Sequence, residues 1–191
     1  MTARTHDAFA FASLLTIAIL YPPETLNLAT LMTSLVANIV GTLIPDMDQA
    51  SNRLWDLLPA GDHVGKIFRR IFLRHRTLSH SLLGAFLIYK VLEWGLPKLL
   101  NSNFIDVHIV FLSVMIGYGS HLIADGLTKD GIPLFFPFPL SIGFPPISSL
   151  RITTDSWVEK FLVLPCVAGY VVWLFTQNQE KLLQILRLAV K

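Results

Sequence analysis

Charged residues and cysteine are both scarce in this chain of 191 residues. Only 15% of the residues are charged, whereas soluble domains carry roughly 25%. With 53% hydrophobic residues and a mean hydropathy of +0.58, the composition is typical of an integral membrane protein. The single cysteine, Cys166, excludes an intrachain disulfide and a cysteine-rich zinc site. Its apolar surroundings predict an inert packing residue, and the net charge of only +2 gives no reason to expect a nucleic-acid partner.

Long apolar runs are plentiful, and they predict an all-α fold. About 20 apolar residues are needed for a helix to cross a bilayer, and turns or charge clusters separate five runs that approach this length. We expect a polytopic membrane bundle of about five hydrophobic helices, forming one domain over residues 1–191. No small-x-small cleavage site precedes Tyr21, so we expect the first run to be a retained helix. The runs cover residues 8–20, 26–44, 78–92, 107–124 and 161–175.

The distribution of lysine and arginine predicts the orientation of this bundle. If the helices alternate and the N-terminus is inside, ten basic residues share its side of the membrane and five lie on the other side. Cytoplasmic loops are enriched in lysine and arginine, so the N-terminus and the 46–76 loop are predicted to face the cytoplasm. The location expected is therefore the inner (cytoplasmic) membrane. The C-terminal tail fits this count poorly.

Two loops have a distinct character. Residues 64–74 place apolar side chains on one helical face and most of the basic ones on the other, which predicts an amphipathic helix lying on an anionic leaflet. Residues 131–146 hold five prolines and four phenylalanines, so no long helix can form there. This Pro/Phe-rich loop is interpreted either as a lip that admits a lipid tail or as a plug over the helix ends.

The stretch around residues 74–81 carries two histidines at the start of an apolar run. We expect Thr77 or Ser79 to cap the following helix, which places His75 on the approach loop and His80 in the first turn. The guanidinium of Arg76 suits a phosphate group, because its donors match phosphate oxygens.

Two further stretches bring carboxylates to the same side of the membrane. His121 and Asp125 are four residues apart in a helical pattern, so both project from one face. Asp46 and Asp48 follow a proline that ends the preceding helix, and one of them can ligate while the other orients a histidine. Alone, each pair is equally consistent with an ordinary cap or a solvated turn.

On the predicted topology all of these residues, together with His6, reach the same end of the bundle. Mixed imidazole and carboxylate ligands suit zinc, and also manganese or iron(II). The set is larger than one tetrahedral zinc requires, so one or two ions are expected. The Glu159 side chain is expected to be a helix cap, because it completes a capping box with Ser156. The expected metal ligands or their supporting residues are His6, Asp46, His75, His80, His121 and Asp125.

With these residues in place, the chain resembles the YdjM-like family of bacterial inner-membrane proteins, which are described as metal-dependent hydrolases. The resemblance rests on Gly41-Thr-Leu-Ile-Pro-Asp-Met-Asp48, His75-Arg-Thr-Leu-Ser-His-Ser81, Gly119-Ser-His-Leu-Ile-Ala-Asp125 and Gly131-Ile-Pro-Leu-Phe-Phe-Pro-Phe138. This family often has a histidine where the chain has Gln49, so that ligand is absent here. The family is also distantly similar to zinc-dependent phospholipase C and P1 nuclease, which are helical and bind a zinc cluster.

Three functions remain open from the sequence. The first is a metal-dependent hydrolase acting on a phosphoester of a membrane lipid or lipid-linked substrate, with Asp48 as general base and Arg76 on the phosphate. The second is an amide or ester hydrolase at the same site. The third is a protein without enzymatic activity, whose polar cluster holds a structural metal or handles ions. Inside the predicted spans, Asn38 and Ser113 are the polar residues that could extend an ion path.

Overall fold

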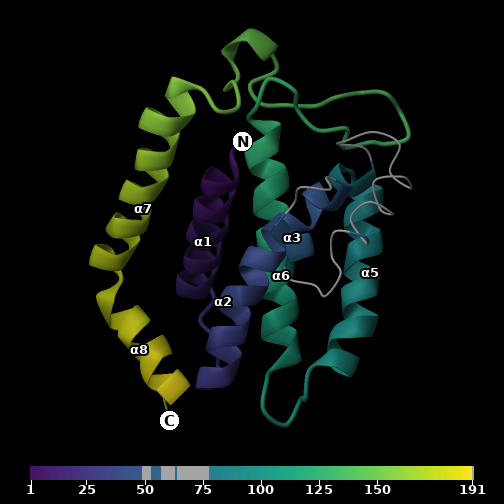
Figure 1. Ribbon diagram of the computed structural model, residues 1–191. Coiled ribbons are helices and arrows are strands. Elements are labelled where there is room, and N and C mark those ends of the chain that lie inside the picture. The colour runs from purple at the N-terminus through teal and green to yellow at the C-terminus, as the bar shows by residue number, and fades with distance from the viewer. Residues whose placement is uncertain (49–52, 57–62, 64–77, 191) are drawn as a thin grey trace.

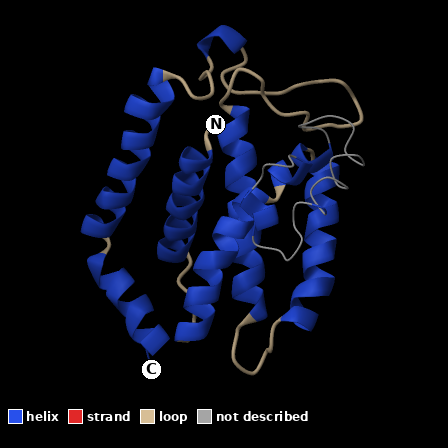
Figure 2. Ribbon diagram, viewed as in Figure 1, coloured by secondary structure: helices blue, strands red, loops and turns tan. Residues whose placement is uncertain are grey.

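The computed structural model describes residues 1–48, 53–56, 63 and 78–190, and their regular structure is helical (Figures 1 and 2). This arrangement confirms the predicted all-α membrane bundle. Shorter helical segments are the 3-10 helices η1 (Pro45–Asp48), η2 (Leu78–His80) and η3 (Ser148–Leu150) and the π-helical η4 (Glu159–Val163), which continues into α7. The helices are α1 (Ala3–Leu20), α2 (Leu28–Leu43), α3 (Arg53–Asp56), α5 (Leu82–Leu99), α6 (Val107–Gly126), α7 (Leu164–Gln177) and α8 (Gln179–Val190).

Three helical stretches are long and apolar enough to cross a membrane. They are α1, α6 and the continuous stretch Glu159–Gln177 formed by η4 and α7. The first and fifth predicted segments therefore have the length of full spans. In contrast, α2 has only 16 residues, so it is shorter than the apolar run suggested. Helix α5 has the length of a span but is more polar than these three, because it carries Lys90, Glu93 and Lys98.

The start of α5 differs from the prediction. Neither predicted cap is used: Thr77 lies outside the described residues, and Ser79 belongs to η2. The cap is Ser81, whose hydroxyl accepts a hydrogen bond from the Gly84 backbone N–H at 3.0 Å. His80 therefore precedes the helix rather than lying in its first turn, because the side chain of Ser81, one residue later, accepts from the first free N–H groups of α5.

Helices α2 and α6 pack against each other over most of their length, and two glycines permit their close approach. A Cβ atom at Gly41 would lie 2.2 Å from the Val114 carbonyl oxygen, and one at Gly117 would lie 2.1 Å from the Asn38 carbonyl oxygen. Small residues at helix interfaces allow such backbone contact in membranes. The buried Asn38 side chain donates to the Ser113 carbonyl at 3.2 Å within the same interface.

The start of α1, the end of α6 and the start of α5 lie at one end of the bundle (Figure 1). Glu159 attaches α1 to this end, because its carboxylate accepts hydrogen bonds from the Thr2 backbone N–H at 2.6 Å and the Thr2 hydroxyl at 2.9 Å. The Ser156 hydroxyl accepts from the Glu159 N–H at 3.3 Å, so the Ser156 half of the predicted capping box forms. The Glu159 carboxylate accepts from the Asp155 N–H at 2.7 Å rather than from the Ser156 N–H, and it therefore links the start of its own helix to Thr2.

The Pro/Phe-rich loop lies at the same end and forms no long helix, as predicted. Main-chain hydrogen bonds tie it down: Ile132 and Ile142 pair with each other, and Leu82 N–H donates to the Leu134 carbonyl at 3.0 Å. The loop therefore joins the end of α6 to the start of α5.

Two other expectations have different outcomes. The amphipathic helix expected over residues 64–74 lies outside the described residues and stays a prediction. Cys166 is exposed on α7, so the expectation that it packs in the interior is wrong. A membrane helix exposes apolar residues on its lipid-facing side, and an apolar run alone does not distinguish that side from the core.

Candidate metal centre

Three histidines and two aspartates meet at the end of the bundle where α1 begins. They come from four elements: α1, η1, η2 and α6. The structure thus brings together five of the six predicted metal ligands. The sixth, His75, and the predicted phosphate-binding Arg76 lie outside the described residues, and so does the side chain of Asp48. The members of this cluster are His6, Asp46, His80, His121 and Asp125.

Helix α6 supplies His121 and Asp125 one turn apart, on the face that packs against α2. The His121 Nδ1 atom lies 2.7 Å from the main-chain carbonyl oxygen of Thr42. A carbonyl oxygen only accepts, so Nδ1 carries the proton and Nε2 has the lone pair. This Nε2 atom is buried without a hydrogen-bond partner in the described structure. A buried imidazole with an orphaned acceptor is the arrangement that a metal ligand requires.

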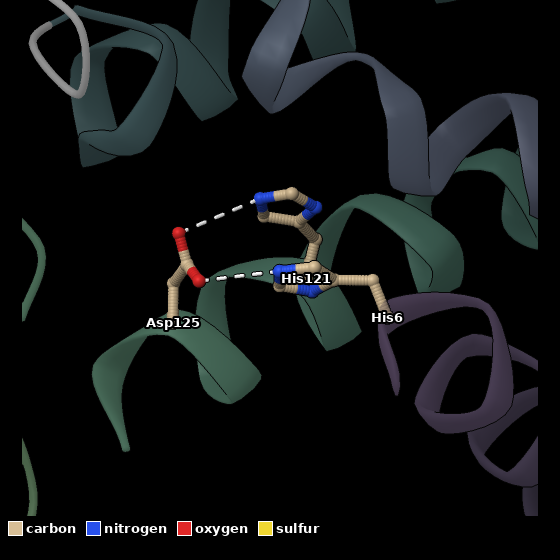
Figure 3. Close-up of side chains that lie close together, drawn as sticks. All are labelled: His6, His121 and Asp125. Carbon is tan, nitrogen blue, oxygen red and sulfur yellow. Dashed lines mark ion pairs between the residues drawn. The ribbon is translucent and has the colours of Figure 1, made fainter. Parts of the chain in front are cut away.

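His6 reaches the cluster from the first turns of α1. Its ring stacks on that of His121, with centroids 3.8 Å apart and planes within 5° (Figure 3). His6 Nε2 lies 3.2 Å from Asp125 Oδ1, and His121 Nε2 lies 3.7 Å from Asp125 Oδ2. Asp125 Oδ1 also accepts a hydrogen bond from the Met1 amino group at 2.6 Å. Asp125 therefore presents one oxygen to each imidazole.

His80 enters from η2, ahead of α5. Its Nε2 atom lies 3.4 Å from Asp125 Oδ2 and 3.6 Å from Asp46 Oδ1. The buried Tyr118 hydroxyl on α6 donates to the Ser79 carbonyl, which fixes the residue next to His80. Burial lowers the pKa of the His80 imidazole from its ordinary value of 6.5. The ring is therefore neutral at pH 7, which is the form that binds metals.

Asp46 gives the cluster an accessible side. It follows Pro45, which ends α2, and it lies 3.7 Å from His121 Nε2. The Asp46 side chain is 28% exposed, whereas those of the other four cluster members are at most 5% exposed. Asp46 is therefore the most accessible member of the cluster in the described structure.

The spacing of the ligand atoms fits a metal ion. Ligands about 2.0–2.1 Å from a tetrahedral zinc lie about 3.4 Å from one another. The distances from the histidine nitrogens to the aspartate oxygens are between 3.2 and 3.7 Å. The atoms form two overlapping triads that share His121: one with His6 and Asp125, the other with Asp46 and His80. The donor set would thus fit one or two ions.

Sequence reasoning missed the residues that support this cluster. Thr42 acts through its main-chain carbonyl, which no side-chain pattern reveals. Tyr118 precedes His121 by three residues on α6, but nothing in the sequence shows that its hydroxyl meets η2. The sequence indicated a capping role for Glu159. The hydrogen bonds from Thr2 to its carboxylate depend on the packing of α1 and could not be predicted. His63 and His108, which were not expected to contribute, are exposed.

Comparison with known proteins gives consistent matches. Residues 1–187 match the family model described as "YdjM inner membrane protein". The "Uncharacterized protein YvsG" of Bacillus subtilis (strain 168) is 28% identical over 163 residues, which cover 85% of this chain and 88% of that protein. The "Inner membrane protein YdjM" of Escherichia coli (strain K12) is 29% identical over 138 residues, which cover 71% of this chain and 63% of that protein. No solved structure matches the chain.

Proposed function

We propose that this chain, which belongs to the YdjM family of inner membrane proteins, is a metal-dependent hydrolase of the membrane. The proposed metal is zinc, with manganese and iron as the other candidates. The proposed substrate is a phosphoester in a lipid or a lipid-linked molecule, approached from the cytoplasmic leaflet. The family and the apolar helices support the inner-membrane location.

The observation that carries the proposal is the orphaned Nε2 of His121. A buried polar atom without a partner costs about 1–3 kcal/mol, and a bound metal ion removes that cost. The His121 Nε2 atom lies 3.7 Å from both Asp46 Oδ1 and Asp125 Oδ2, which is beyond hydrogen-bond distance. A hydrogen-bond network of the same residues would bring the partners of His121 closer.

A divalent ion bound here would polarise a phosphoryl oxygen and lower the pKa of a bound water to about 7. The residues of the chain have separate roles around it. His6, His80 and His121 would hold it through imidazole nitrogens, and Asp125 would supply negative charge to the buried part of the site. Asp48 is proposed as the general base and Arg76 as the group that binds the phosphate, both from their place in the sequence beside ligands.

The lipid substrate is inferred from the surroundings of the cluster. The Pro/Phe-rich loop lies at the same end of the bundle, and its Phe135, Phe138 and Phe144 side chains are exposed. Exposed aromatic residues at the end of a membrane bundle favour the headgroup region. A substrate held in the bilayer would meet this loop and Asp46 together.

Metal content and activity give separate tests. Purified protein should hold a divalent ion, and an Arg76→Gln variant should keep that ion while losing turnover of lipid phosphoesters. If Arg76→Gln hydrolyses phosphoesters like wild type, the phosphate-binding role of Arg76 is wrong. If it loses phosphoester turnover but keeps turnover of an amide or ester, the second hydrolase function is favoured.

One observation favours a structural metal instead. Four of the five described cluster residues are at most 5% exposed, and structural zinc sites are closed. Exchange of the bound ion distinguishes the two cases, because an accessible site at Asp46 exchanges metal with free chelator faster than a closed one. An ion path is less well supported, since the buried Asn38 and Ser113 bond to each other within the α2–α6 interface.

A further inference from the structure

A second site lies in the half of the bundle away from the metal centre. A cavity of about 550 Å³, here called the distal cavity, is lined by side chains of α1, α2, α6, α7 and α8. Its lining on α6 ends at Ile116, five residues before His121, which is about 8 Å along a helix axis. The distal cavity is therefore separate from the metal cluster. Its volume is within the range of single-ligand pockets, roughly 300–1,000 Å³.

The walls of the distal cavity are apolar and stay exposed within the described structure. Met32 on α2, Leu112 on α6 and Phe175 on α7 line it, with exposed fractions of 52%, 44% and 45%. These residues lie on helices of a membrane bundle, so hydrocarbon rather than water is the medium around them. One acyl chain fills such a space without leaving a polar group unpaired. A second copy of the chain would have to insert a helix about 10 Å wide. Because Leu182 and Ile185 of α8 already close one side of the cavity, an acyl chain is the better fit.

Two carboxylates line the distal cavity, and one lysine is adjacent to its lining in the sequence. Glu24 lies in the loop after α1, and Asp106 is the N-cap of α6. Both residues line the distal cavity. No cation lies within ion-pair distance of Glu24 among the described residues. Lys181 on α8 is adjacent to the lining residue Leu182, and its Nζ lies 3.5 Å from the Ile19 carbonyl at the end of α1. The two lining carboxylates complement the ammonium group of a lipid headgroup, and the Lys181 ammonium complements its phosphate.

We propose that the distal cavity binds one phospholipid of the phosphatidylethanolamine class. One acyl chain lies between α1, α2, α6 and α8, the lipid ammonium faces Glu24 and Asp106, and the phosphate faces Lys181. The site occupies the leaflet opposite the metal centre. It is independent of the proposed hydrolase activity, because no residue of the distal cavity belongs to the metal cluster.

The test begins with protein reconstituted in vesicles of equimolar phosphatidylethanolamine and phosphatidylglycerol with identical acyl chains. After re-extraction in mild detergent, native mass spectrometry counts the lipids that remain bound. One lipid per chain is expected, with the ethanolamine lipid favoured about fivefold, the factor given by one exposed ion pair of about 1 kcal/mol. Equal retention of the two lipids, loose lipid without a defined stoichiometry, or a dimer without bound lipid would overturn the proposal.

Two variants locate the bound lipid. Ala18→Phe fills the distal cavity and should abolish retention, whereas Ala29→Phe, at an exposed position on α2 outside the lining, should retain the lipid. Retention by Ala18→Phe would place the lipid elsewhere. Glu24→Gln changes only an exposed loop side chain and should reduce the preference for the ethanolamine lipid, so the proposal stays testable if Ala18→Phe fails to fold. The metal content of each variant should equal that of wild type.

Discussion

His121 donates from Nδ1 to the main-chain carbonyl of Thr42, 2.7 Å away, and this bond turns its Nε2 atom toward Asp46 and Asp125. The contact joins α6 to the last turn of α2. It therefore makes the orientation of a proposed metal ligand depend on the packing of two membrane helices. Because Thr42 contributes only a backbone oxygen, the spacing between α2 and α6 decides whether the bond forms.

Substitution of Gly117 tests this dependence. Gly117→Ala should reduce the free energy of unfolding by about 1–3 kcal/mol, the cost of overpacking, because the new Cβ would meet the Asn38 carbonyl. Gly119→Ala is a matched control on the same helix, since a methyl group there would have no neighbour within 4 Å in the described structure. It should leave stability unchanged or raise it by up to about 1 kcal/mol. Thermal unfolding in detergent measures both, and equal stability of the two variants would contradict the close packing of α2 and α6.

Tyr118 should act as a positioning residue for His80. Tyr118→Phe removes the hydrogen bond to Ser79 without leaving a cavity, so we expect metal affinity to fall about 10–100-fold, as for other supporting residues of metal sites. Tyr89→Phe, on the exposed face of α5, should bind metal like wild type. Competition with a metallochromic chelator measures the affinities. Unchanged affinity in Tyr118→Phe would show that η2 is held by other contacts.

His6 should contribute to metal binding without being indispensable. The second triad, Asp46, His80 and His121, is complete without it, so His6→Ala should keep at least one ion per chain with weaker total binding. His121→Ala removes the residue shared by both triads and should lose all bound metal. Elemental analysis of the two variants side by side decides the point. Complete loss of metal in His6→Ala would contradict the overlapping triads.

Most of the fold could be predicted from the sequence because hydrophobic length dominates membrane helices. The apolar run predicted at residues 107–124 corresponds to α6, which ends two residues later. The absence of charged residues in this run was sufficient to predict the helix. The prediction was less accurate where polar residues occur within apolar runs. α5 continues through Lys90 and Pro97 to Leu99, because a proline in the last turn removes only one main-chain hydrogen bond.

The site could be predicted as a set of residues but not as a geometry. The topology placed His6, Asp46, His80, His121 and Asp125 at one end, and the structure brings these five together. What the sequence could not supply is the side-chain orientation, which depends on the Thr42 carbonyl, the Tyr118 hydroxyl and the anchoring of Thr2 by Glu159. These contacts join residues between 39 and 157 positions apart, and no local pattern encodes them.

Removal of metal should destabilise the folded protein. A ligand present at about 100 times its Kd stabilises the native state by about 2.7 kcal/mol, so an excess of chelator should lower the unfolding temperature of wild type. The His121→Ala variant binds no metal in this account and should not respond to the chelator. His108→Ala, at the exposed start of the same helix, should respond like wild type. A chelator that leaves wild type unchanged would indicate that the cluster is stable without an ion.

The most direct test is the metal content of the purified protein in detergent, measured by elemental analysis beside a His121→Ala/Asp125→Asn double variant. The account predicts one or two divalent ions per chain in wild type, with zinc foremost, and none in the variant. Wild-type protein that holds no ion after zinc, manganese and iron have each been supplied would contradict it. The five residues would then form a buried polar network without a metal.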